Sequence, residues 1–177
     1  MIVTVVVAGE VGFWLVLAAG LAARYLLGLR RLGAALLLGL PLVDLVVVGA
    51  TVLDLRHGAT ASATHGLAAA YVGFTAAYGH SLVRWADARA AHRFAGGPKP
   101  PGAPKYGRAR AVHEWRIFGR TLLGAAVTVA LIAAMILLAG DSDRSDALTA
   151  WYLRMAWVTG VSLVVAASYT VFPKQPR

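Results

Sequence analysis

Long apolar runs separated by short polar stretches dominate the chain. Five runs reach the length of about 20 mostly apolar residues that a membrane-spanning helix needs. The expected spans cover about residues 2–27, 32–53, 61–83, 117–139 and 148–172. This pattern predicts an all-α membrane protein, in which residues 1–177 form a single transmembrane domain, a bundle of five transmembrane helices.

The longest polar connection covers about residues 84–116 and divides into three parts. Residues 85–94 predict an extension of the third helix beyond the membrane. Residues 96–107 are interrupted throughout by Pro and Gly, which excludes a helix there. Residues 108–120 predict a basic, amphipathic helix whose apolar side faces lipid.

Basic residues gather at alternate ends of the five expected spans, and their positions fix the orientation. The crowded ends hold Arg24, Arg30, Arg31, Arg84, Arg89, Arg93, Lys99, Lys105, Arg108, Arg110, Arg116, Arg120, Lys174 and Arg177. The remaining three basic residues are Arg56, Arg144 and Arg154. Because loops rich in Lys and Arg stay in the cytoplasm, we expect the N-terminus outside and the C-terminus in the cytoplasm.

Composition supports a protein of the bacterial cytoplasmic membrane. Hydrophobic residues make up 59% of the chain and charged residues only 14%, against about 45–50% and about 25% in soluble domains. The net charge of +9 is accounted for by orientation and by contact with the lipid bilayer, with anionic lipid at the cytoplasmic face. We therefore expect no nucleic-acid partner. The absence of cysteine excludes disulfides and thiolate chemistry, and no cofactor is expected.

Ionisable residues inside the spans are the first candidates for function, because a charge in hydrocarbon costs about 2.5–3.5 kcal/mol even on a lenient scale. Glu10 and Arg154 lie at similar depths in the first and fifth spans. They are expected to form an ion pair that fixes how these helices pack, unless Arg154 extends toward the outer surface. The alternative is that Glu10 binds a proton or a ligand.

Asp44 is the deepest acidic residue, and Pro41 lies one helical turn before it. The proline leaves a backbone carbonyl without its usual donor. A neutral Asp44 that donates to such a carbonyl is one interpretation. The other is a proton relay, a cation site or a general acid.

The third span is rich in Gly and Ala, which allow close helix approach, so it is expected at the centre of the bundle. Thr64, Tyr71 and Tyr78 repeat every seven residues on it and form a polar stripe, for which packing is favoured over a cavity. Tyr71 is retained as a ligand-binding candidate. The fourth span carries no deep charge and is expected to be the most exposed to lipid.

Metal binding is not favoured. His65 and His80 are about 22 Å apart on one helix, too far to share an ion. Asp54 and His57 approach His65 at the outer end and form a weak candidate metal site. Hydrogen bonding of the histidines at the membrane surface is the favoured interpretation.

Four short segments resemble a known family. They are His65-Gly66-Leu67-Ala68-Ala69, Gly79-His80, Trp85-Ala86-Asp87 and Gly97-Pro98-Lys99-Pro100. Together they are similar to the small YmcC-like integral membrane proteins of Gram-positive bacteria. The resemblance covers most of the chain and implies a polytopic membrane protein. It implies no particular activity and no catalytic residue.

Three classes of function remain open. The favoured class is an accessory or structural membrane subunit, whose polar residues specify helix packing and which has a partner subunit in the membrane. The second is a small transport protein that conducts ions, protons or solutes through Glu10 and Asp44, with Arg154 and His65 as further candidates, and that requires a homo-oligomer. The third is a membrane-embedded enzyme that acts on a lipid or isoprenoid, with Asp44 or Glu10 as the catalytic general acid.

Overall fold

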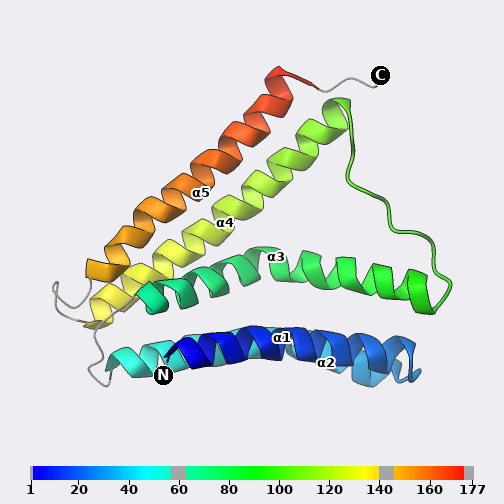
Figure 1. Ribbon diagram of the computed structural model, residues 1–177, viewed down its shortest axis with the longest axis horizontal. Helices are drawn as coiled ribbons and strands as arrows, with labels where there is room; N and C mark the ends of the chain where they lie inside the picture. Colours follow the sequence, from blue (N-terminus) through cyan, green and yellow to red (C-terminus); the bar gives the residue numbers. More distant parts are fainter. Residues whose placement is uncertain (1, 57–62, 140–145, 174–177) are drawn as a thin grey trace.

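The computed structural model describes residues 2–56, 63–139 and 146–173, and at some helical positions, including Glu10, Asp44 and Asp54, it describes the backbone alone. These residues form five helices (Figure 1). They are α1 (Ile2–Tyr25), α2 (Arg30–Arg56), α3 (Ala63–Phe94), α4 (Gly107–Ala139) and α5 (Asp146–Val171). The prediction of an all-α fold is confirmed.

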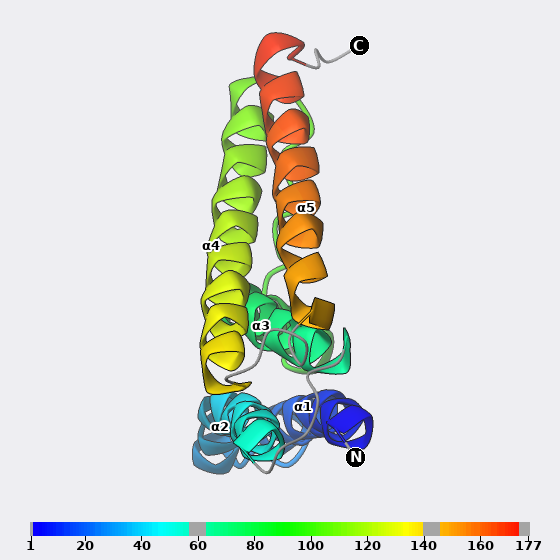
Figure 2. The same cartoon turned by 90° about the vertical axis from the view of Figure 1, so that its left-hand side faces the viewer.

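Two antiparallel helix pairs are joined by the central helix α3. One pair is α1 with α2, and the other is α4 with α5 (Figure 1). α3 lies between them and contacts all four other helices, as expected for the third span (Figure 2). The ends of α1, α3 and α5 and the starts of α2 and α4 lie toward one side, here called the basic end, where the two pairs diverge (Figure 1).

Small residues bring α3 and α4 into backbone contact. A Cβ atom on Gly73 would lie 2.6 Å from the carbonyl oxygen of Gly124 and closer still to Thr128 Oγ1. The Thr128 hydroxyl is fully buried and lies 2.8 Å from the Gly124 carbonyl oxygen and 3.5 Å from that of Ala69. Glycine at such a contact lets two membrane helices gain dispersion energy along their backbones.

The α3–α4 contact continues toward the basic end and toward α5. The Tyr78 hydroxyl lies 2.7 Å from Thr121 Oγ1 and 3.1 Å from the Ile117 carbonyl oxygen. At the opposite end, the Trp151 indole of α5 packs on Gly66, where a Cβ atom would overlap the ring. A cluster of buried side chains fills the space between α3, α4 and α5, and its members are Ala69, Ile132, Met135 and Leu148.

The α1–α2 pair is also closed by a glycine contact. A Cβ atom on Gly33 would lie 2.6 Å from the Gly20 carbonyl oxygen. Phe13, Leu17 and Leu40 form the buried cluster of this pair.

The α1–α2 pair is attached to α3 by polar contacts. Tyr25 donates a hydrogen bond of 2.9 Å to Asp87 Oδ1, and an Arg24 guanidinium nitrogen lies 3.5 Å from the same oxygen. This contact joins the end of α1 to the part of α3 that extends beyond the predicted span.

Helix boundaries agree with the sequence pattern where local composition is decisive. α3 continues to Phe94, as the extension over residues 85–94 predicts. Residues 95–106 are not helical, in keeping with the Pro and Gly positions. Gly107 has a φ of 63°, a conformation that favours glycine, and α4 starts there and continues unbroken through the predicted fourth span.

By length and composition, three of the described helices can cross a membrane. They are Val7–Tyr25 in α1, Gly107–Leu137 in α4 and Ala147–Val171 in α5. The expected spans 32–53 and 61–83 lie in α2 and α3, which are helical over their described residues but are not among these three. Gly, Ala, Thr and His in α3 lower its hydropathy.

The expectation that the fourth span is the most exposed to lipid is wrong. α4 is the most buried of the three spans, and α5 is the least buried. α4 lacks deep charges, but it carries Thr121, Gly124, Thr128 and Ile132 in positions buried by α3 and α5. A span without charge is therefore not necessarily a lipid-facing span, because small residues also direct burial.

The α3–α4 contact predicts a specific sensitivity to added volume. Gly73→Ala should lower the free energy of unfolding by about 1–3 kcal/mol, because the new methyl group overlaps backbone atoms. Thermal unfolding in detergent would measure this change. Gly119→Ala is the matched control on α4, since a Cβ atom there meets nothing within 4 Å. Equal Tm values for the two variants would contradict the proposed packing role.

Candidate functional site

The basic end contains two acidic residues between positions 84 and 120, Asp87 and Glu114. Each contacts an arginine: Asp87 contacts Arg24, and Glu114 forms an ion pair with Arg110 one turn before it on α4. The Glu114 side chain is 6% exposed, whereas that of Arg110 is 27% exposed. A partly buried pair of this kind holds its cation in a fixed position, unlike freely solvated surface charges.

The start of α4 and the end of α5 are fastened side by side. The Trp115 indole nitrogen donates to Thr170 Oγ1 at 2.9 Å, and the Thr170 hydroxyl donates to the Ala166 carbonyl oxygen at 3.1 Å. The Trp115 ring also meets the Phe118 ring edge to face, with centroids 5.5 Å apart. These contacts set the register that places Tyr169 beside the first turns of α4.

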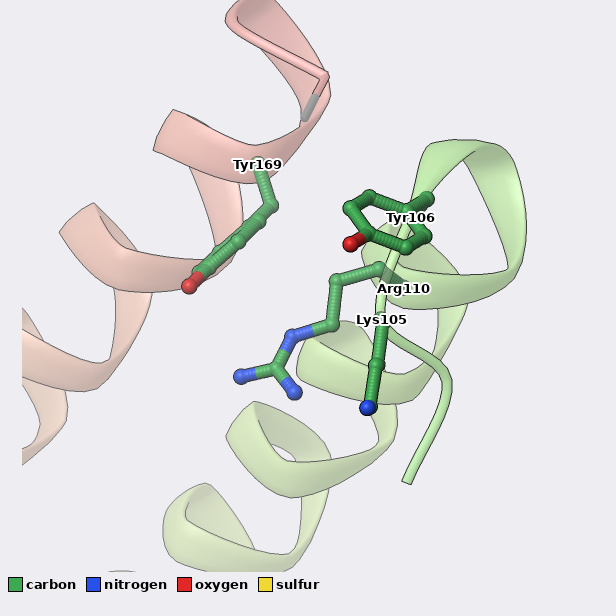
Figure 3. A pocket seen from close by; sticks show the side chains of 4 residues that line it. All are labelled: Lys105, Tyr106, Arg110 and Tyr169. Atoms are coloured by element: carbon green, nitrogen blue, oxygen red, sulfur yellow. The ribbon is translucent and has the colours of Figure 1, made fainter. Parts of the chain in front are cut away.

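A pocket of about 240 Å³ lies between these helix ends. It is lined by Lys105, Tyr106, Arg110 and Tyr169 (Figure 3). The Arg110 guanidinium carbon lies 4.8 Å from the centre of the Tyr169 ring, within the range of a cation–π interaction. In Figure 3 the Tyr106 hydroxyl points into the space between the two rings, whereas the Tyr169 hydroxyl points away from Tyr106.

Arg110 is held from three sides. Its guanidinium group contacts the Glu114 carboxylate and the Tyr169 ring, and it reaches the Pro104 carbonyl oxygen at 3.4 Å. Its Nε atom is buried and has no hydrogen-bond partner among the described residues.

The lining residues supply two cations, a phenol hydroxyl and no carboxylate. Such a set can bind an anion, since Arg and Lys both pair with oxyanions and a phenol donates a hydrogen bond. The lining residues include no Ser, His or acid that would form a nucleophile–base pair.

The four sequence candidates at Glu10, Asp44, Asp54 and His57 are not tested by the structure. Glu10 lies in α1, and Asp44 and Asp54 lie in α2, with the backbone alone described. His57 lies outside the described residues. Their proposed proton, ligand and metal roles stay predictions.

Arg154, Tyr71 and His65 have described side chains. The Arg154 guanidinium carbon lies 4.7 Å from the centre of the Trp151 ring on the same helix. Its pairing with Glu10 stays a prediction, because the Glu10 side chain is not described. Tyr71 packs beside Ala68.

His65 is buried near the start of α3, with 2% of its surface exposed. His80 is exposed. Within the described ranges, no three His, Asp or Glu side chains approach closely enough to hold a metal ion. Asp54 and His57, the other members of the weak candidate set, are not covered by that search.

The sequence reasoning missed the pocket. It assigned Lys105 and Arg110 to orientation and general lipid contact, and it gave Tyr169 no role. One local signal was present, since Arg110 and Glu114 are four residues apart and face the same side of a helix. Tyr169 carries no such signal, because only the pairing of α4 with α5 brings it to the pocket.

Comparison with known proteins identifies the family. The chain is 34% identical over 169 residues to an uncharacterized membrane protein, YmcC, of Bacillus subtilis (strain 168). The match covers 95% of this chain and 90% of that protein. The chain belongs to the YmcC-like family. No family model matches the chain, and no solved structure matches it.

The family resemblance inferred from the short segments is confirmed by this match. Membership in the YmcC-like family and three apolar helices of sufficient length identify the chain as a multi-pass membrane protein. The relative's name specifies no substrate or partner, and the chemistry of the site follows from its own residues.

Removal of the Glu114 carboxylate should destabilise the α4–α5 end. Glu114→Gln is expected to lower the free energy of unfolding by about 1–3 kcal/mol, because it leaves the partly buried Arg110 guanidinium without its carboxylate partner. The double variant Glu114→Gln, Arg110→Leu should lose less free energy of unfolding than the sum of the losses in the two single variants. Chemical unfolding in detergent measures all three losses, and strictly additive losses would show that the two residues are not coupled.

Proposed function

We propose that the chain is an accessory, structural subunit of the cytoplasmic membrane, with five spans and a basic end that rests on anionic lipid. The observation that carries this proposal is the use of polar groups at the α3–α4 contact. Tyr78 of α3 bonds across to the Ile117 carbonyl oxygen and Thr121 Oγ1 of α4, and the buried Thr121 and Thr128 hydroxyls also bond to carbonyl oxygens of their own helix. Polar groups used in this way specify packing and are not presented to a substrate.

The packing of α2 on α1 supports a five-span arrangement. α1 is apolar enough to cross the membrane, and α2 runs antiparallel along it through the Gly20–Gly33 contact and the Leu40 cluster. A helix fastened along a spanning helix enters the bilayer with it. α2 has 27 residues, about 40 Å at about 1.5 Å per residue, which exceeds the hydrocarbon thickness of about 30 Å.

The packing of α3 on α4 extends the same argument to the third span. The contacts run from Ala69 and Thr128 to Tyr78 and Ile117, so the first half of α3 lies at the depth of the apolar part of α4. The low hydropathy of α3 is compatible with this depth, because many of the small and polar residues in its first half are buried against neighbouring helices, namely His65, Gly66, Ala68, Ala69, Ala70 and Gly73.

The charges favour a cytoplasmic position for the basic end. Twelve described basic residues lie at this end, and they are Arg24, Arg30, Arg31, Arg84, Arg89, Arg93, Lys99, Lys105, Arg108, Arg110, Arg116 and Arg120. The N-terminus then lies outside. A basic surface beside the cytoplasmic leaflet gains about 1 kcal/mol per Lys or Arg from anionic lipid.

α5 offers the surface on which a partner subunit would rest. Its outer face forms a shallow apolar groove lined by Leu153, Ala156, Trp157, Gly160, Val161, Val164 and Val165. Ala156 and Gly160 are small residues one turn apart, a spacing that permits close approach of another helix.

Single cysteines test the topology cleanly, because the chain contains no cysteine of its own. A membrane-impermeant maleimide added to intact spheroplasts should label Gly58→Cys and Ser142→Cys, and it should leave Gly102→Cys unlabelled until the membrane is opened. Gly58 decides the span number, since a chain that crosses only with α1, α4 and α5 would keep position 58 inside. Protection of position 58 would therefore contradict five spans.

The accessory role predicts no conduction by the protein alone. Proteoliposomes loaded with a pH-sensitive dye should show proton and potassium fluxes equal to those of empty vesicles. Asp44→Asn is the informative variant, because it removes the deepest acid of the sequence at nearly constant shape. A wild-type flux that this variant abolishes without unfolding would replace the accessory role by transport.

A further inference from the structure

We propose that the pocket lined by Lys105, Tyr106, Arg110 and Tyr169 binds a phosphate group that an anionic lipid presents at the membrane surface. This inference rests on the proposed function, which places the basic end against the cytoplasmic leaflet. The proposed function gives the basic end only a general attraction to lipid through its total charge. The pocket adds one defined site at this surface, which binds one chemical group.

The depth of the pocket matches that of lipid headgroups. The α4 segment Gly107–Leu137 has 31 residues, about 46 Å at about 1.5 Å per residue. The hydrocarbon core takes up only about 30 Å of that length. If Leu137 lies at the far edge of the core, roughly the first ten residues of α4 extend into the headgroup layer. Arg110 lies among them, and the Trp115–Thr170 hydrogen bond sets the end of α5 at the same level.

The charges around the pocket match a phosphodiester. Lys105 and Arg110 contribute two positive charges, and the Glu114 carboxylate paired with Arg110 contributes one negative charge. The resulting excess of one positive charge equals the single negative charge of a lipid phosphodiester. A headgroup without a cation of its own fits this balance, whereas choline would bring a second cation beside Lys105.

The donors of the pocket are held in place before a ligand arrives. Glu114, Pro104 and Tyr169 fix the Arg110 guanidinium. The Tyr106 hydroxyl points into the space between the rings (Figure 3). Preorganised donors bind an oxyanion at a smaller entropic cost than free surface side chains do.

The first turn of α4 adds to the positive electrostatic potential of the pocket. The pocket lies at the N-terminus of a helix of 33 residues, and no acidic residue lies in its first turn. The helix dipole and the free N–H groups at this end favour an anion. The volume of about 240 Å³ accommodates several water-sized groups, which take about 30 Å³ each in the liquid, so a phosphate group fits.

Isothermal titration of the full chain in a neutral detergent tests the site. The probes are dihexanoyl phosphatidylglycerol, dihexanoyl phosphatidylcholine and inorganic phosphate. Phosphatidylglycerol should bind with the highest affinity. Lys105→Gln should weaken that binding about tenfold, which corresponds to a loss of about 1.4 kcal/mol, and Tyr106→Phe should weaken it about threefold. These two variants leave the Arg110–Glu114 pair intact, so folding should be preserved.

A control variant separates the pocket from total charge. Lys99→Gln removes an exposed lysine of the same connection that does not line the pocket, and it should leave the Kd unchanged. Equal weakening by Lys99→Gln and Lys105→Gln would overturn the proposal in favour of diffuse attraction.

The remaining outcomes distinguish a lipid phosphate from a soluble one, and failure of the binding site from failure of the proposed function. Inorganic phosphate binding as tightly as the lipid, with the same loss in Lys105→Gln, would overturn the lipid source and assign a soluble phosphate compound. No binding of any probe would overturn the site itself while leaving the accessory role intact. Labelling of position 102 from outside would instead overturn the cytoplasmic placement, which the titration does not test.

Discussion

The close approach of α3 and α4 is the constraint on which the arrangement depends. Inside a bilayer, burial of apolar side chains gives helices little reason to associate, because lipid tails are equally apolar. Gly73 and Gly124 permit backbone contact, and the Thr128 hydroxyl bonds within that contact. Since α3 also carries the α1–α2 pair, loss of this contact would weaken the connection between the two halves of the molecule.

Charge at the basic end acts on two scales. In the proposed topology, the sum of the basic residues sets the orientation and requires no particular geometry. Asp87 and Glu114 act locally: Asp87 joins α3 to Arg24 and Tyr25 of α1, and Glu114 fixes Arg110 on α4. The two acids therefore convert part of a diffuse positive surface into defined contacts, one on each side of the opening between the helix pairs.

Local sequence predicts where the helices lie along the chain better than it predicts which helices pack against one another. The five helices, the extension of α3 and the non-helical residues 95–106 follow from hydropathy and from Pro and Gly positions, which act within a few residues. The absence of deep charge in α4 predicts lipid exposure, and this prediction is wrong because α3 and α5 cover the small residues of α4. The pocket was missed because Tyr169 reaches Arg110 only through the register of α4 against α5, a property of two distant segments.

The pocket and the deep acids differ in the physical status of their charges. A carboxylate in hydrocarbon is costly unless it is paired or protonated, and the proposed five-span topology places Glu10 and Asp44 there. A lysine or arginine at headgroup depth costs little, and by itself indicates only orientation. Arg110 differs from its basic neighbours because a buried carboxylate, a carbonyl and an aromatic ring fix it in place. A cation immobilised in this way suits the proposed positioning of one particular anion, whereas a freely solvated cation supplies only general attraction.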